Sequence, residues 1–493
     1  MIRRYFKDAG FTGVAEILIR CKGLVIMPLL TYHLGAVNYG VWSQVLVLVG
    51  ILGPFVTLAT ETGFMRHAAG KSDEVQKQYF TAWLLYILVN ASLVTGSLAL
   101  LRSYAAEVFF DDAKRFSPFI LLAAATLYLT VILNIARYWF LVRHRPRMYT
   151  LISVMQSVFG VVAVVVTLLR SDGVYELIIY TLVGDLLLVI PLFLMIAFRD
   201  EFGRPDINII WPIIRFSIPL VPAGIAVWAL NMVDRLFLVH FATLADIGIY
   251  SLAYTIGYTI IPILARPLWM MYPSLATAAF NEGRMDDLQR IFDYSAGTVL
   301  ILTLPATVGL FVLGTPIVSV LSPPEFAAAA PVIGLVALGY VLMTMASYLE
   351  VHMGFLYRQH FFTISVIVSV MVNILLNYLL IPKYGILGAA IATTISFATQ
   401  FVISYIVSLS LKIVRINYTF VIKVITASII MGAVLEAMRY YLFTSSFNSY
   451  SEIILVTIFG IVVYSSTILG LGVLPPDKLS SLRRSIVSIM PGK

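Results

Sequence analysis

Charged residues inside long apolar runs are the feature of this sequence best suited to chemistry. The run VWALNMVDRLFLVHF, from Val227 to Phe241, carries Asp234 and Arg235 side by side. Charge is costly inside a bilayer, so an intramembrane acid or base indicates a functional site. Neighbours on a helix point about 100° apart, so we expect these two to have separate partners. We predict that Arg235 contacts an anion in an outward-open state and that Asp234 regulates it or tethers two lobes; a purely structural tether is the alternative.

A second group of charges is basic and lies toward one side of the predicted spans. Arg20 and Lys22 stand about 12–15 Å into the first span, at ~1.5 Å per residue. Arg137 and Arg266 lie near the ends of spans that return to the same side. Clustered Arg and Lys can replace the water around a phosphate or pyrophosphate with charge-assisted hydrogen bonds. The four residues therefore predict an anion-binding vestibule.

Some of these charges also have simpler explanations. Arg66 and Arg358 lie close enough to span ends to reach the interface without any substrate, and the same reading stays open for Arg137 and Arg266. Glu16 precedes Arg20 by four residues, so the two can pair on one helix face. Such a pair either neutralises the arginine or forms a gate that a phosphate opens.

Isolated acids predict a second kind of site. Asp185 falls near the middle of a span, in YTLVGDLLLVIPLF, with no base within a turn. That position suits coupling to a H+ or Na+ gradient; a hydrogen-bonded packing residue is the alternative. Glu350, near the inner end of its span, is a further candidate for coupling or gating. Glu436 and Arg439 are spaced i, i+3 and are predicted to pair with each other.

The elements that carry these charges are apolar helices. The chain of 493 residues is 60% hydrophobic and only 12% charged, and its mean hydropathy is +0.95. Runs of about 20 apolar residues predict transmembrane helices, so we expect an all-α polytopic membrane protein. The fourteen expected spans are 12–34, 40–62, 79–101, 117–140, 147–170, 174–198, 212–240, 248–270, 293–320, 329–355, 361–381, 386–411, 417–439 and 451–473.

Loop charge predicts the orientation of these spans. Most of the 33 lysines and arginines fall on the side of the N-terminus, which the positive-inside rule makes cytoplasmic. The net charge of +8 therefore reflects basic loops, and no nucleic-acid partner is expected. An even number of spans places both termini in the cytoplasm. We also expect the protein to lie in the plasma (inner) membrane. The opposite side carries few basic residues: Arg102, Lys114, Arg115, Arg170 and Lys383.

The two halves of the chain repeat. NYGVWSQVLVLVGILGP, from residue 38, matches DIGIYSLAYTIGYTIIP, from residue 246, so that Gly40 pairs with Gly248 and Ser43 with Ser251. Each unit has six spans, which predicts a parallel repeat about an axis along the membrane normal, with a binding site between the halves. The expected divisions are a six-helix lobe over 1–205, a second over 206–412, extra helices over 413–474 and a cytoplasmic amphipathic tail over 475–493.

Two stretches carry a family resemblance. DRLFLVHFATLADIGIYSLAY, from Asp234, and NILLNYLLIPKYGILGAAIATTIS, from Asn373, resemble spans of polysaccharide transporters in the multidrug/oligosaccharidyl-lipid/polysaccharide exporter superfamily, most of all its Wzx-like flippases. The resemblance implies two six-helix lobes around a cavity open alternately to each side. It also implies a substrate that is a glycan on an isoprenoid pyrophosphate, with membrane lipids and glycan-biosynthesis enzymes as partners.

The second stretch also has a physical reading of its own. Pro382 should end a helix, Gly385 should shape a turn, and the small residues from Gly388 should allow close helix packing. Asn373 and Asn377 share one helix face, where hydrogen bonding between helices is favoured over ligand contact.

Other functions remain as alternatives. A cation-coupled multidrug exporter should have twelve spans and an acidic cavity. A glycan polymerase or ligase usually has a large external loop with basic catalytic residues, and no such loop is present here. The chain contains no P-loop, HExxH or catalytic triad pattern, and its one cysteine, Cys21, excludes an internal disulfide and a cysteine-rich metal site. We therefore expect a transporter with no bound cofactor.

Overall fold

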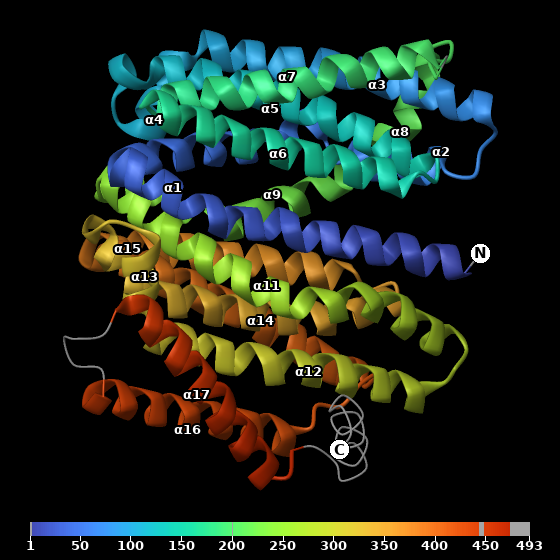
Figure 1. Ribbon diagram of the computed structural model, residues 1–493. Helices are drawn as coiled ribbons and strands as arrows, with labels where there is room; N and C mark the ends of the chain where they lie inside the picture. The colour runs from blue at the N-terminus through green and yellow to red at the C-terminus, as the bar shows by residue number, and fades with distance from the viewer. Residues whose placement is uncertain (1, 200, 443–447, 474–493) are drawn as a thin grey trace, which may run out of the picture.

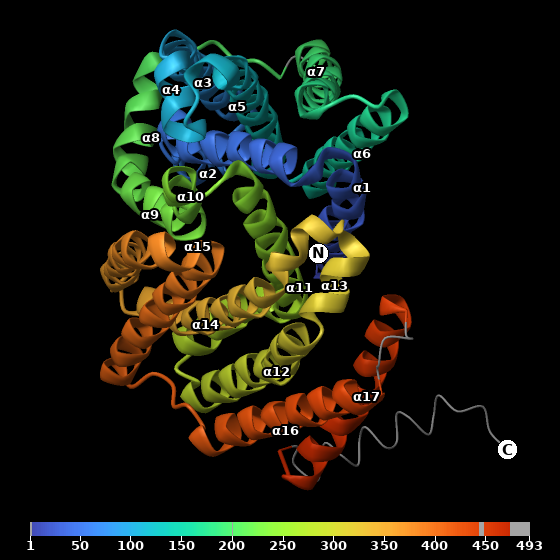
Figure 2. The same cartoon turned by 90° about the vertical axis from the view of Figure 1, so that its left-hand side faces the viewer.

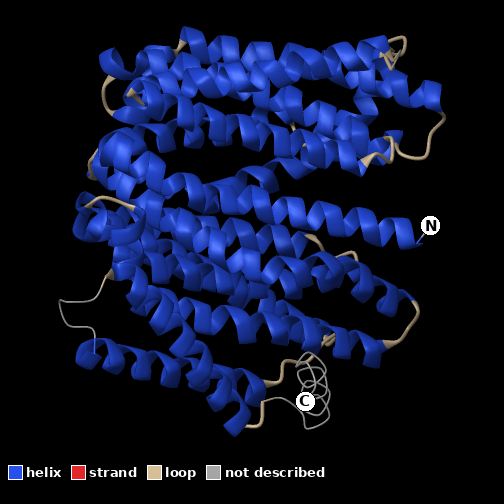
Figure 3. Ribbon diagram, viewed as in Figure 1, coloured by secondary structure: helices blue, strands red, loops and turns tan. Residues whose placement is uncertain are grey.

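The computed structural model describes residues 2–199, 201–442 and 448–473, with side chains from Lys22 onward except Ile207 and Leu442. These residues are helical or lie in short connections, and no strand occurs among them (Figures 1 and 3). The predicted amphipathic tail, 475–493, lies outside the described residues. We call residues 2–198 the N-terminal lobe and residues 210–411 the C-terminal lobe.

The N-terminal lobe contains seven of the described helices. They are α1 (Ile2–Thr57), α2 (Thr60–Ala68), α3 (Asp73–Leu100), α4 (Arg102–Phe110), α5 (Ala113–Val142), α6 (Pro146–Arg170) and α7 (Val174–Phe198). Long apolar stretches make them helical, because a bilayer offers no partner for a free backbone amide or carbonyl group.

The C-terminal lobe begins with a broken span. It comprises α8 (Ile210–Ser217), α9 (Val221–Met232), α10 (Asp234–Phe241), α11 (Leu244–Asn281), α12 (Met285–Val312), α13 (Gly314–Leu321), α14 (Ala330–Phe355) and α15 (His360–Leu411). Short 3-10 turns, η1 (Ile207–Ile209), η2 (Ile218–Leu220) and η3 (Pro324–Ala329), join some of these, and α16 (Tyr418–Leu442) and α17 (Ser449–Gly470) follow. Figure 2 shows α8, α9 and α10 running from the N-terminal lobe to α15.

Twelve of the described helices are long and apolar enough to cross a membrane. Two of them change direction at a glycine, α1 at Gly35 (φ 71°, ψ 174°) and α15 at Gly385 (φ 53°, ψ −131°). Such backbone angles are almost confined to glycine, which lacks the Cβ that would clash. Each of these two helices therefore contains two of the predicted spans. The twelve helices thus account for all fourteen predicted spans. Pro382 stays inside α15 and does not end a helix as predicted, whereas the turn predicted at Gly385 is confirmed.

The two lobes meet at one end of the helix bundle. Figure 1 shows the N-terminus at one end and the turn of α1 at the other, which we call the Gly35 end and set against the N-terminal end. One apolar core crosses between the lobes and joins α1 to α11 through residues such as Tyr39, Val47, Tyr250 and Ile256. Separate cores serve each lobe toward the N-terminal end, around Trp139 and around Tyr272. The lobes thus have independent packing where a cavity separates them.

Helices α16 and α17 pack on the outside of the C-terminal lobe. Their own apolar core includes Val424, Leu435 and Val456 and reaches Leu313. Arg439 donates to Glu452 Oε1 at 2.7 Å and pairs with Glu436 at 3.5 Å. The predicted Glu436–Arg439 pair is confirmed, and the additional bond to Glu452 ties the two helices together.

Candidate functional site: a basic cavity between the lobes

A cavity of about 880 Å³ lies between the two lobes. Four of the basic residues singled out in the sequence line it, and no carboxylate does so among the described residues. They come from different helices: Lys22 from α1, Arg137 from α5, Arg235 from α10 and Arg266 from α11. Cations converge on the cavity surface while the nearby carboxylates lie behind it, an arrangement that suits an anionic group.

Contact between helices closes this cavity at the Gly35 end. A Cβ on Gly40 would stand 1.9 Å from the carbonyl oxygen of Leu244, and one on Gly248 would stand 2.1 Å from that of Ala36. Backbone therefore packs directly on backbone between α1 and α11. One turn deeper, the Ser43 and Ser251 hydroxyls are 2.6 Å apart. The two residue pairs that the repeat made equivalent thus touch each other.

The turn of α1 is also held by the C-terminal lobe. The Ala36 amide donates to Glu325 Oε1 at 2.7 Å, and Thr31 Oγ1 donates to the carbonyl of Leu321 at 2.8 Å. Because the first amides of a helix have no partner inside the helix, the Glu325 carboxylate acts as a cap supplied by the other lobe. Opening this end requires all these contacts to break.

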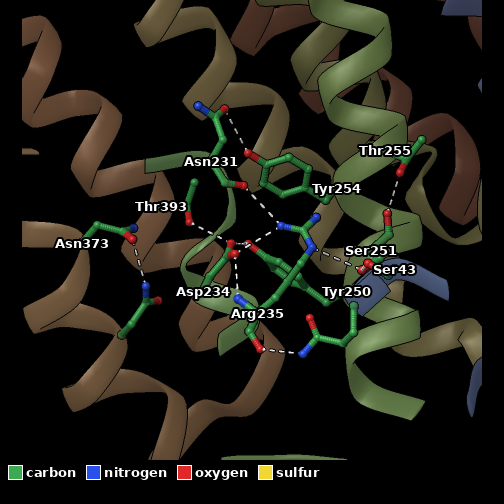
Figure 4. Close-up of polar contacts among 12 residues, drawn as sticks. Ser43, Asn231, Asp234, Arg235, Tyr250, Ser251, Tyr254, Thr255, Asn373 and Thr393 are labelled. Atoms are coloured by element: carbon green, nitrogen blue, oxygen red, sulfur yellow. Dashed lines mark hydrogen bonds and ion pairs between the residues drawn. The ribbon is translucent and has the colours of Figure 1, made fainter. Parts of the chain in front are cut away.

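Arg235 and Asp234 are paired, which corrects the prediction that adjacent residues would not meet. Arg235 Nη1 lies 3.2 Å from Asp234 Oδ1, and the backbone amide of Arg235 donates to the same oxygen at 2.8 Å. Asp234 is the first residue of α10, where the helix restarts after Val233. At this restart the long arginine side chain folds back over α9 toward the carbonyl of Asn231, 3.2 Å away. Figure 4 shows the guanidinium over the ring of Tyr254.

Both members of this pair are almost completely buried. Asp234 is 2% and Arg235 3% exposed. Asp234 Oδ2 also accepts hydrogen bonds from Tyr250 and Thr393, while the Arg235 guanidinium carbon lies 4.4 Å from the Tyr254 ring centroid. Arg235 nevertheless belongs to the same cavity as the other three cations. From the sequence we predicted that Arg235 belongs to a separate anion contact toward the outer side. In the structure this contact and the basic vestibule are parts of one cavity.

In the N-terminal lobe, Gln156 links an arginine of the cavity to the buried acid of α7. Arg137 Nη2 donates to Gln156 Oε1, and Gln156 Nε2 donates to Asp185 Oδ1 at 3.0 Å. Asp185 is 4% exposed and interacts electrostatically with Arg137 and Lys22. The acid that looked isolated in the sequence therefore lies behind two cations of the cavity. Arg137 Nε is buried and has no hydrogen-bond partner among the described residues.

The remaining candidates lie elsewhere. Glu350 is away from the cavity, and its Oε1 accepts from Gln400 at 3.0 Å and Ser404 at 2.8 Å within the C-terminal lobe. Arg66 stacks on Phe216 at 4.5 Å, which agrees with a structural role. The side chains of Glu16 and Arg20 lie outside the described part of the structure.

The asparagine pair and the small residues of α15 are structural features. Asn377 Nδ2 donates to Asn373 Oδ1 at 2.9 Å within the helix, so the bond predicted between helices lies within one. Gly388 is buried, and a Cβ there would stand 2.5 Å from the Leu380 carbonyl oxygen, which confirms the predicted close packing.

Sequence reasoning missed an aromatic and hydroxyl-rich wall of the cavity. Tyr254, Tyr258 and Tyr340 lie on one side of it. Hydroxyls and amides from both lobes also line it: Ser43, Thr150, Ser153, Gln156, Ser157, Asn231, Ser251, Thr255 and Thr259. On α6 the spacing of residues 150, 153 and 157 was a readable signal, because such positions share one helix face.

Helices that cross the membrane, two lobes and a cavity between them define a polytopic transporter. The chain belongs to the family described as polysaccharide biosynthesis protein, whose model matches residues 30–331, more than half of the chain. A curated relative from Haloferax volcanii, the probable low-salt glycan biosynthesis flippase Agl15, is 22% identical over 300 residues, which is 61% of this chain and 62% of the relative.

Solved structures show the same fold. A lipid II flippase, MurJ, in an inward closed conformation superposes with a TM-score of 0.75 at 15% identity, over 93% of this chain and 97% of that one. An inward-facing multidrug resistance MATE family transporter gives 0.61 at 14% identity, over 80% and 98% of the two chains. The fold expected from the sequence, that of the multidrug/oligosaccharidyl-lipid/polysaccharide exporter superfamily, is confirmed.

Proposed function

We propose that this protein is a flippase that moves a glycan linked to an isoprenoid phosphate or pyrophosphate from the inner to the outer leaflet. The observation that carries the proposal is the cavity between the lobes, where four cations from four helices converge and the described lining contains no carboxylate. A phosphate group must lose headgroup water to enter the protein, and Arg and Lys side chains replace that water. The family and the glycan flippase relative support the same reading.

The cavity also suits the first half of an alternating-access cycle. It is closed at the Gly35 end by α1 and α11, and its lining runs from there to Tyr149 and Arg266. The excess of basic residues in the loops supports a cytoplasmic N-terminal end and the plasma membrane. A lipid-linked substrate would then enter from the cytoplasmic leaflet, and rocking of the lobes would expose it on the other side.

We further propose that Asp185 participates in ion coupling. It is a buried acid linked through Gln156 to Arg137, so a change in its charge would alter the electrostatic potential at the cavity wall. In vesicles, Asp185→Asn should abolish the dependence of transport on an imposed H+ or Na+ gradient while leaving binding of the lipid intact. Unchanged gradient dependence would return Asp185 to a packing role.

A multidrug exporter of the same fold is the competing function. Its organic cation substrates need carboxylates in the cavity wall, whereas the described lining is basic. The superposition on a MATE transporter is one of fold alone. The composition of the cavity therefore favours an anionic substrate.

A binding measurement tests the proposal. Purified protein in nanodiscs should bind undecaprenyl pyrophosphate, and Lys22→Gln, Arg137→Gln and Arg266→Gln should each weaken binding by about tenfold or more, as expected for charge-assisted hydrogen bonds. Arg290→Gln is the matched control, because that side chain is 82% exposed and lies outside the cavity. In cells, Lys22→Ala should remove surface glycan at normal protein level. Binding that none of the cavity variants alters would overturn the proposal.

A further inference from the structure

One aromatic ring in the cavity is exposed within an otherwise buried helix face. Tyr258 of α11 is 41% exposed, while Gly257 and Thr259 on either side of it are buried. It lies in the lining of the cavity, so its exposed surface faces an aqueous space between the lobes. Part of this side chain is therefore accessible to a ligand in the cavity.

Neighbouring aromatics hold this ring in a fixed orientation. The Tyr340 ring meets it edge-on, at 5.2 Å between centroids and 62° between planes, and Tyr254 lies at 6.5 Å and 24°. The hydroxyls of Tyr254 and Tyr340 are themselves 2.7 Å apart, and that of Tyr340 donates to Asn231 Oδ1 at 2.7 Å. A platform whose supports are buried and hydrogen-bonded loses little entropy when a ligand stacks on it.

Hydroxyl groups line the same cavity as this ring. Ser153 and Thr255, from opposite lobes, line the cavity and donate back to carbonyls of their own helices, Tyr149 at 3.0 Å and Ser251 at 2.8 Å. With their protons committed, the hydroxyl oxygens present lone pairs to the cavity and can accept hydrogen bonds from a ligand. The cavity thus offers both an aromatic side chain and hydroxyl acceptors to a ligand.

That combination matches a sugar ring. A pyranose has a face of C–H groups that packs on an aromatic face and an edge of hydroxyls that donate hydrogen bonds. A hydrocarbon chain would leave the hydroxyl wall without partners, and a bare phosphate would not use the aromatic face. We infer that Tyr258 is the stacking platform of a sugar subsite, which takes the pyranose next to the pyrophosphate held by the cavity cations. This inference rests on the proposed function and adds the part of the site that reads the glycan.

Binding measurements with two lipids test the sugar subsite separately from the proposed function. Purified full-length protein is titrated with undecaprenyl pyrophosphate and with the same lipid carrying one N-acetylglucosamine. Stacking reads the C–H face rather than individual hydroxyls, so a single monosaccharide is sufficient. Wild type should bind the sugar-bearing lipid about three- to tenfold more tightly, the range expected for one aromatic contact.

Three variants give the expected pattern. Tyr258→Leu should lose the gain from the sugar and bind the bare lipid normally, whereas Tyr258→Phe should keep the gain. Tyr378→Leu is the control, since that tyrosine is 62% exposed on α15 and lies outside the cavity lining. Arg266→Gln should weaken both lipids equally.

Each other result overturns the subsite. Equal binding of the two lipids by wild type, or an equal effect of Tyr258→Leu on both, would show that the ring does not contact sugar. A loss in Tyr258→Phe as large as that in Tyr258→Leu would assign the effect to the hydroxyl rather than the ring face. Failure of wild type to bind either lipid would instead remove the proposed function, and the sugar subsite with it.

Discussion

Ser43 and Ser251 stand at equivalent positions of the two repeats and their hydroxyls lie 2.6 Å apart. Residues related by a two-fold axis can touch only on that axis, so this hydrogen bond marks the axis between the lobes. The glycines one turn away, Gly40 and Gly248, meet in the same manner through their backbones. The Gly35 end is therefore closed by the contact of two copies of the same sequence pattern.

Cross-linking these two serines should lock the Gly35 end. Cys21 is the one native cysteine, so Ser43→Cys and Ser251→Cys can be combined in a Cys21→Ser background. Their side chains are close enough for a disulfide. Transport in proteoliposomes should stop on oxidation and return on reduction, because the lobes must separate here for the substrate to leave.

The single-cysteine variants are the controls and should respond to neither reagent. Full transport by the oxidised double variant would mean that this end does not open.

Alanine at Gly40 or Gly248 should force the lobes apart. The added Cβ would stand about two ångströms from a carbonyl oxygen of the opposite helix, at 1.9 Å and 2.1 Å respectively. Overpacking of this kind costs ~1–3 kcal/mol, so the melting temperature in detergent should fall and a cysteine placed at this end should label faster. Gly53→Ala in α1 is the control, since nothing lies within 4 Å of its Cβ position. An unchanged melting temperature in Gly40→Ala and Gly248→Ala would argue against tight contact between the lobes.

Neutralising one member of the Asp234–Arg235 pair should destabilise the protein more than neutralising both. Both side chains are buried, at 2% and 3% exposure, and a charge left alone in such a place costs about 3–5 kcal/mol. Arg235→Gln and Asp234→Asn should each lower the melting temperature, and the double variant should recover part of the loss. Simple addition of the two single effects would show that the residues are not coupled.

Alanine at Gly385 should disrupt the turn between the last two spans of the C-terminal lobe. The backbone angles there, φ 53° and ψ −131°, suit glycine alone. Forcing a Cβ into this region costs ~1–3 kcal/mol, although the site has room for it, since nothing lies within 4 Å. Gly309→Ala is the control, because the Cβ position there is also open and its helix is regular. Equal melting temperatures for both variants would mean that the turn adapts at no cost.

The sequence by itself determined the spans, because the thickness of a bilayer imposes a length and hydropathy that can be read locally. The span predicted over 174–198 is α7, Val174–Phe198. It also identified four cations of the cavity, since a charge that interrupts an apolar run is conspicuous without knowledge of its neighbours. The repeat pairs Gly40–Gly248 and Ser43–Ser251 were legible as a pattern in the same way.

Tertiary structure alone decided which of these residues meet. Asp234 and Arg235 pair because the helix restarts between Met232 and Asp234, a break that an average helical angle of 100° per residue does not anticipate. Asp185 gained a link to Arg137 through Gln156, a residue on another helix. Tyr258 was invisible in the sequence, since a tyrosine in an apolar run suits lipid, core or cavity equally well. Only the packing of α11 within the C-terminal lobe and against α1 places that ring in the lining of the cavity.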